Sequence, residues 1–286
     1  MKEFLSHFSA AEVWDIPNID SVLGFKIAET DLAHITLTKH NVRHSNSRTE
    51  VHSCVLALPR GAVVARGSET IASPELLFLE LAGLLSIHRL ILLGLQLCSH
   101  PPGCPSEAIT TKKKLMTFLA RAKGHRGYRK ALRAVQYVEN GSASVMESLA
   151  YMILTLPNAL GGYGLNGAVF NHEIILKEEG RTRLGHLRCF TDLYYTKAKL
   201  AVEYESFSYH SSPLEQGKDA VRAAILERQG IDVMHLSTVQ LYDKYACRDF
   251  ACNLSSRIGK RISIRTKKFN EMHDLMRALL PDGQPV

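Results

Sequence analysis

Short runs of alternating hydrophobic and polar residues mark the first part of the chain. Between residues 33 and 70 three such runs are separated by polar or glycine-rich segments: AHITLTKH, EVHSCVLAL and RGAVVARG. A period of two in β-branched residues predicts three strands. An apolar stretch of helical length follows, with Ser73 as a suitable N-cap and Pro74 at the first helical position.

Glycines divide this apolar stretch. Because Gly83 and Gly94 interrupt it, we expect two packed helices instead of one. Its charged residues and His88 argue against a membrane span. Two further helices, rich in Lys and Arg, are predicted at about 113–123 and 128–138.

A second pattern begins near residue 141. Ser144 and Glu147 form an S-x-x-E capping box before an apolar helix. Three strand-like runs then follow, NHEIILKEE, HLRCFTDLYYT and KLAVEYESF, and the short TKAK turn makes the last two antiparallel neighbours. A helix at about 214–229, a strand IDVMHLS and a helix-rich tail complete the order, which predicts a mixed α/β core with a crossover.

Composition bounds the architecture. The 286 residues allow two domains, which we place at 1–140, a smaller α+β domain, and 141–286, an α/β domain with a mixed sheet. The hydrophobic fraction of 45% and charged fraction of 22% are typical of globular proteins. The first residues lack a long apolar segment, so we expect no signal peptide, no membrane partner and a cytoplasmic location. The six cysteines are expected to be reduced, since CSHPPGC is not a recognised zinc pattern, although a zinc site there is a minor alternative.

The net charge of +7 is informative because it is clustered. Residues 112–133 contain nine Lys or Arg and 257–268 contain six, with no acid in either segment. Each segment alone could be a solvated helix face, but together they predict a polyanionic partner, DNA first and RNA as an alternative. The candidate phosphate contacts are Lys112, Lys113, Lys114, Arg126, Arg129, Lys130, Lys267 and Lys268.

Two carboxylates interrupt an apolar strand at residues 200–207. Glu203 and Glu205 are two apart, so they point to the same face, about 6–7 Å from each other. The TKAK hairpin brings Asp192 beside Glu203. Three converging acids predict a Mg²⁺ site; the alternative is that they are simply solvated at a sheet edge.

The stretch DLYYTKAKLAVEYESFSYHSS, residues 192–212, resembles the PD-(D/E)XK nuclease superfamily and within it the very-short-patch-repair (Vsr-like) group. This resemblance implies a restriction-endonuclease-like fold over about 142–240 and hydrolysis of DNA with Mg²⁺ or Mn²⁺. It assigns Asp192 and Glu205 as metal ligands, Glu203 as a ligand or the residue that positions water, and His210 as general acid or base. Further matches are Glu147 as the first-motif acid, the D-x-x-R pair Asp219 and Arg222, of which Arg222 is a candidate nucleic-acid contact, and the closing strand at Gly230, Ile231 and Val233.

Two departures from that pattern leave alternatives open. Glu205 stands where the superfamily has lysine, and Glu205-Ser206 replaces the Asp-Gly of the Vsr-like group. The rival interpretation is therefore a DNA-binding regulator with a degenerate, non-catalytic nuclease fold. Individually, Glu147 could serve only as the capping partner of Ser144 and His210 could be a surface residue. Asp219 and Arg222 could form an i,i+3 ion pair.

Residues 45–135 resemble the C-terminal portion of AbiEi-family antitoxin-like proteins, with a strand pair, a turn containing Ser73-Pro74-Glu75 and two apolar helices. No match for the winged helix of that family is found in residues 1–32. The resemblance implies a link with defence or mobile elements.

Overall fold

The computed structural model describes residues 3–29, 32–38, 45–185, 187–205 and 213–281. These form two compact units, Met1–His100 with Ser106–Asn140 and Pro101–Pro105 with Gly141–Val286. Both units combine helices with a mixed sheet, so the expected α/β class is confirmed. Within the described residues, no helix has the length and apolar character needed to cross a bilayer.

The first unit contains a five-stranded sheet in the order β3-β2-β1-β5-β4. Its strands are β1 (Glu3–Leu5), β2 (Ala33–Leu37), β3 (Thr49–Ser53), β4 (Val63–Arg66) and β5 (Glu69–Ala72). The three predicted strands correspond to β2, β3 and β4, although β3 ends at Ser53 and the apolar residues that follow it are not in a strand. β1 and β5 were not predicted, because each has only three or four residues and is held by non-local pairing.

Six α-helices accompany this sheet in the described part of the first unit. They are α1 (His7–Val13), α2 (Ile19–Leu23), α3 (Pro74–Leu81), α4 (Ile87–Leu97), α5 (Lys112–Leu119) and α6 (Tyr128–Val135). The predicted N-cap is confirmed, since the Ser73 hydroxyl accepts the Leu76 N–H at 3.2 Å. Gly83 separates α3 from α4 as expected, whereas Gly94 lies inside α4.

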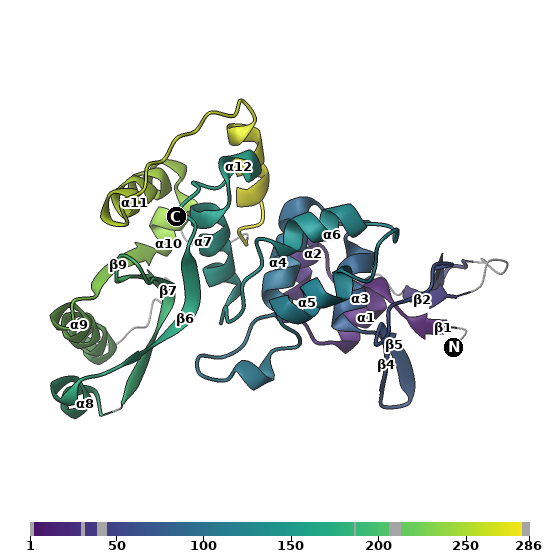
Figure 1. Ribbon diagram of the computed structural model, residues 1–286, viewed down its shortest axis with the longest axis horizontal. Helices are drawn as coiled ribbons and strands as arrows, with labels where there is room; N and C mark the ends of the chain where they lie inside the picture. Colours follow the sequence, from purple (N-terminus) through teal and green to yellow (C-terminus); the bar gives the residue numbers. More distant parts are fainter. Residues whose placement is uncertain (1–2, 30–31, 39–44, 186, 206–212, 282–286) are drawn as a thin grey trace. The chain divides into compact units, whose positions relative to one another are not determined.

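The second unit contains a four-stranded sheet in the order β6-β7-β8-β9 (Figure 1). Its strands are β6 (Ala168–Ile175), β7 (Arg188–Tyr195), β8 (Leu200–Glu205) and β9 (Asp232–Ser237). β6, β7 and β8 are antiparallel neighbours, and β9 lies parallel to β8 after the crossover helix α9 (Pro213–Arg228). The predicted order of helix, three strands, helix and strand is therefore confirmed, except that a short helix, α8 (Glu178–Leu184), lies between β6 and β7.

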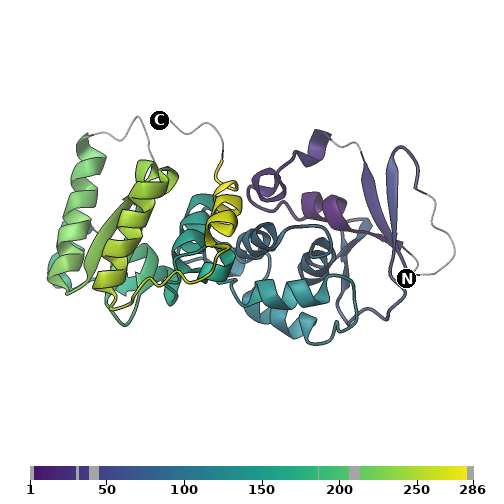
Figure 2. The same ribbon diagram turned by 90° about the horizontal axis from the view of Figure 1, so that it is seen from above.

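The remaining helices of this unit are α7 (Val145–Thr155), α8 (Glu178–Leu184), α10 (Thr238–Tyr242), α11 (Lys244–Arg257) and α12 (Phe269–Arg277). In Figure 2 the green α9 and the yellow-green α11 run alongside the strands. Ile225 and Leu226 of α9 pack against Tyr194 of β7 and Ala201 of β8, which buries one face of the sheet. α8 replaces the loop expected at EGRTRLG, a segment too short and polar to show helical periodicity.

Candidate functional site

Two acidic side chains lie next to each other on the sheet of the second unit. The antiparallel register pairs Leu193 of β7 with Val202 of β8, so the next positions along are Asp192 and Glu203. Residues opposite each other in an antiparallel pair point to the same face. The predicted proximity of Asp192 and Glu203 thus follows from the hairpin, and we refer to these two residues as the acidic pair.

An arginine from the crossover helix contacts the acidic pair. Nη2 of Arg222 donates to Oε1 of Glu203 at 3.0 Å and also to the carbonyl oxygen of Phe190. The side chains of Glu203 and Arg222 are 11% and 29% exposed, so this ion pair is largely screened from water. Arg222 therefore lies beside the acidic pair as a counter-ion, and the contact with nucleic acid expected of it stays a prediction.

The two acids differ in their hydrogen bonds. Oδ2 of Asp192 accepts the backbone N–H of Tyr204 at 2.7 Å. Burial raises the pKa of Asp192, and the Tyr204 N–H and the Arg222 charge oppose that rise. Burial and, secondly, the charge of Asp192 raise the pKa of Glu203 to about 7, despite the opposing effect of Arg222. One arginine therefore does not fully offset the cost of burying two carboxylates.

Glu147, at the third position of α7, forms one half of the predicted capping box, and its role as the first-motif acid stays a prediction. Its backbone N–H donates to the Ser144 hydroxyl at 3.1 Å, and its Oε2 accepts the N–H of Ala143 at 2.9 Å. Burial and then the charge of Asp192 raise the pKa of Glu147 to about 7. Glu147 is thus a helix cap whose carboxylate is also sensitive to the acidic pair.

Asn171 was not identified from the sequence. It lies in β6 with a positive φ of 42°, a conformation that asparagine tolerates better than most residues. Its Nδ2 donates to the carbonyl oxygen of Gly141 and approaches Oε2 of Glu147 at 3.5 Å. The only sequence signal was that Asn171 is the polar first residue of the predicted strand NHEIILKEE.

Glu205 does not join the acidic pair. Its carboxylate contacts Nδ1 of His235 at 2.7 Å, with side chains that are 56% and 41% exposed. Within the described residues, no group of three or more His, Cys, Asp or Glu side chains is placed to hold a metal ion. The predicted ligand set of Asp192, Glu203 and Glu205 is therefore not assembled, because Glu203 is bonded to Arg222 and Glu205 to a residue of β9.

Two of the predicted positions cannot be compared in this way. His210 lies outside the described residues, and so does the side chain of Asp219. Their proposed roles remain predictions.

The predicted phosphate contacts fall into two groups. Lys112 is bonded to Glu139 at 2.6 Å, and Lys130 donates to the carbonyl oxygen of Leu85 at 2.8 Å, so both take part in contacts within the first unit. The others are exposed: Lys113, Lys114, Arg126, Arg129, Lys267 and Lys268. These exposed side chains form no ion pair with a described acid and are therefore available to contact phosphate groups.

A second buried polar cluster, in the first unit, had no sequence signal because its members come from separate elements. The rings of His7 and His52 stack with centroids 3.6 Å apart, and Nδ1 of His34 lies 3.0 Å from Nε2 of His52. Oε2 of Glu80 accepts the backbone N–H of His7 at 3.1 Å. Burial, followed by the charges of His52 and His34, lowers the pKa of His7 to about 3, and burial raises the pKa of Glu80 to about 8.

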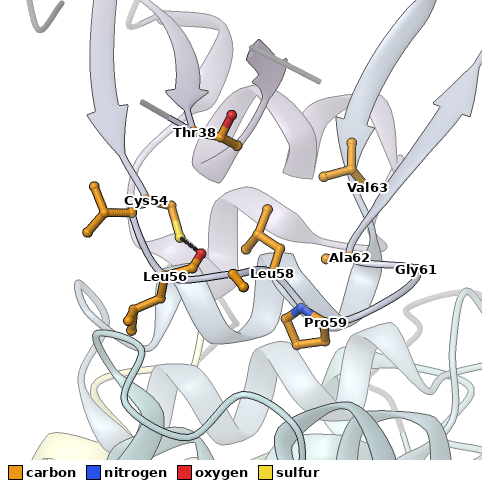
Figure 3. A pocket seen from close by; sticks show the side chains of 10 residues that line it. Thr38, Cys54, Leu56, Leu58, Pro59, Gly61, Ala62 and Val63 are labelled. Atoms are coloured by element: carbon orange, nitrogen blue, oxygen red, sulfur yellow. Dashed lines mark hydrogen bonds between the residues drawn. The ribbon is translucent and has the colours of Figure 1, made fainter. Parts of the chain in front are cut away.

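The loop between β3 and β4 borders a cavity of about 350 Å³ (Figure 3). Cys54 lines it and donates to the carbonyl oxygen of Leu56 at 3.6 Å, with Nδ1 of His125 at 3.7 Å from the sulfur. Burial and the charge of Glu80 raise the pKa of Cys54. The sulfur is therefore held as a thiol, which is a poor nucleophile.

Comparison of the chain with models of protein families, with curated proteins and with solved structures gave no match.

Proposed function

We propose that the chain binds nucleic acid, with duplex DNA as the first candidate, and that it does not hydrolyse it. The observation that carries this proposal is the set of exposed cations on and between α5 and α6. These are Lys113, Lys114, Arg121, Lys123, Arg126, Arg129 and Arg133, and none of them pairs with a described carboxylate. Seven such charges within about twenty residues form the electrostatic footprint expected of a phosphate-binding surface.

The second unit supports the same proposal through its topology. Its order of α7, three antiparallel strands, α9 and a parallel β9 agrees with the fold that the resemblance to the PD-(D/E)XK superfamily implies. Asp192 and Glu203 lie at the two strand positions that the motif assigns to acids. We therefore assign this unit a restriction-endonuclease-like scaffold, and the first unit an AbiEi antitoxin-like one, with the link to defence or mobile elements that this implies.

The contacts of the three acids support the proposed absence of hydrolysis. Arg222 supplies the positive charge that Glu203 contacts, and Glu205 is exposed beside His235. The lysine that orients the attacking water in the superfamily is absent, because Glu205 occupies its position. Neither a three-carboxylate metal site nor the water-orienting lysine is thus available among the described residues.

A charge-reversal comparison tests the binding. The variant Lys113→Glu/Arg129→Glu should bind a duplex at least about tenfold more weakly in a gel-shift measurement at moderate salt, since phosphate contacts dominate affinity. Arg48→Glu/Lys197→Glu is the matched control, because it makes the same charge change at exposed positions that belong neither to α5 and α6 nor to the segment between them. An equal loss of duplex affinity in both variants would argue against a defined binding surface. The same measurement with duplex RNA of the same sequence shows whether the protein prefers DNA or RNA.

A plasmid assay tests the absence of hydrolysis. Supercoiled plasmid incubated with the protein and Mg²⁺ or Mn²⁺ should remain intact while it is bound. Cleavage that disappears in Asp192→Ala and Glu203→Ala would contradict this part of the proposal and restore the metal-dependent nuclease.

A further inference from the structure

A groove of about 530 Å³ lies in the first unit beside α5. Its walls are one face of α5, the start of α3, the loop before β4 and the residue that follows α1. Pro59 and Gly61, which Figure 3 labels, line both this groove and the neighbouring cavity. The volume lies within the roughly 300–1,000 Å³ typical of ligand sites.

The groove is strongly basic. Lys113 and Lys114 of α5 and Arg121, two residues after the end of α5, line the groove, and Arg60 lines it from the loop. Glu75 is the one acidic residue in the lining, and its carboxylate accepts the hydroxyl of Thr110. Four cations against one acid leave an excess of three positive charges (4 − 1 = 3), which favours an anionic ligand.

The groove also contains an aromatic ring. The indole of Trp14 contributes to the lining, and its Nε1–H donates to the carbonyl oxygen of Ala72 at 2.8 Å. The guanidinium of Arg66 lies 4.8 Å from the ring centroid. This hydrogen bond and this cation–π contact hold the ring in place, so the groove has a fixed aromatic surface beside exposed cations.

We propose that this groove binds an unpaired nucleotide of a single-stranded nucleic acid. The cations would contact the phosphates, and a base would stack at Trp14. Single-stranded sites combine these two features, a basic channel and an aromatic platform, whereas bases inside a duplex are already stacked and cannot enter. The inference rests on the proposed function and deepens it, because the groove shares Lys113, Lys114 and Arg121 with the surface described above and would bind single-stranded segments or ends there.

Tryptophan fluorescence measures binding at this groove directly, because Trp14 is the only tryptophan in the chain. A short oligothymidylate should quench the fluorescence in a saturable manner, and inorganic phosphate at the same concentration should not. Lys114→Glu/Arg121→Glu should weaken the quenching titration at least about tenfold. The control Arg48→Glu/Lys197→Glu reverses two exposed cations that neither line the groove nor belong to the cation set on and between α5 and α6, and it should titrate like the wild type.

Stacking is tested separately by Trp14→Leu. Filter binding should show an affinity for the oligonucleotide lower by about 5- to 150-fold, which corresponds to the loss of one stacked base. Duplex binding by the same variant should stay within about twofold of the wild type and shows that it is folded.

The outcomes separate the two proposals. An oligonucleotide that binds without quenching, or that quenches equally in the Lys114→Glu/Arg121→Glu variant, overturns the groove assignment while duplex binding remains. Absence of binding to any nucleic acid overturns both proposals.

Discussion

Among the described residues, Arg222 is the one cation that forms an ion pair with the acidic pair of Asp192 and Glu203. It is one cation beside two buried carboxylates, and Glu147 adds a third acid that responds to the charge of Asp192. The sequence placed Arg222 near the acids only as part of a D-x-x-R pair. Its contact with Glu203 could not be predicted, because it depends on how α9 crosses the sheet.

Replacing Arg222 by methionine should destabilise the second unit. Glu203 would keep its burial and lose its only ion-pair partner among the described residues, a change that costs about 3 kcal/mol in comparable sites. Urea unfolding measures this loss. Arg188→Met is the control, because its pair with Glu173 is exposed and should contribute about 1 kcal/mol or less. Equal stabilities of the two variants would contradict the role given to Arg222.

Glu147 gives a pH-dependent prediction. Its pKa is raised to about 7, so the folded state binds a proton that the unfolded state releases near the ordinary value of 4.5. The stabilisation from this proton is therefore fully present below about 4.5 and is lost as the pH rises through 7. Glutamine at this position retains the cap but has no proton to lose.

The difference in unfolding free energy between wild type and Glu147→Gln measures this linkage. The wild type should be favoured at pH 5 relative to pH 8 by roughly 2 kcal/mol, read from the unfolding transition of the second unit. A difference that stays constant over this range would show that the Glu147 carboxylate is not buried beside Asp192 as described.

At the scale of elements, the sequence pattern predicted the features that depend on residues close together in the chain, such as helix caps and the β7–β8 hairpin. The cap at Ser73, the cap in which Ser144 accepts the N–H of Glu147, and the hairpin that joins β7 to β8 all follow from neighbours in sequence. The pairing of Glu205 with His235 depends on the parallel register of β8 and β9, which a 26-residue separation in sequence does not reveal. For that reason two members of the predicted acidic trio are adjacent and the third is not.

Gly94 shows why one helix boundary was misjudged. A Cβ at this position would lie 2.4 Å from Cγ2 of Val138 and 3.0 Å from Cε2 of Phe78, so this glycine is required by packing and does not end α4. Gly94→Ala should therefore destabilise the first unit by about 1–3 kcal/mol, although alanine is the better helix former.

The matched control lies in another helix. Gly217 is within α9, and a Cβ there would meet no atom within 4 Å. Gly217→Ala should stabilise by about 0.5–1 kcal/mol through helix propensity alone. Thermal unfolding of both variants compares the effects, and a stabilised Gly94→Ala variant would refute the packing explanation.

At the scale of the whole molecule, charge patterning was the most informative feature of the sequence. Most Lys and Arg side chains of the acid-free segment 112–133 are exposed on and between α5 and α6. Lys112 and Lys130 instead make contacts within the first unit. The groove at Trp14 combines residues from four separate elements, so no stretch of sequence could indicate it. Linear charge thus predicts a polyanionic partner, which the binding measurements test, and only the fold placed an aromatic ring among the cations.

The salt dependence of duplex DNA affinity tests the central claim most directly. Each phosphate contact contributes about −0.9 to the slope of log affinity against log salt concentration. Reversing Lys113, Lys114, Arg126 and Arg129 to Glu should therefore reduce the magnitude of that slope by roughly 3–4 units. A wild-type slope near zero, or a slope that is the same in wild type and variant, would contradict binding of phosphate by this surface.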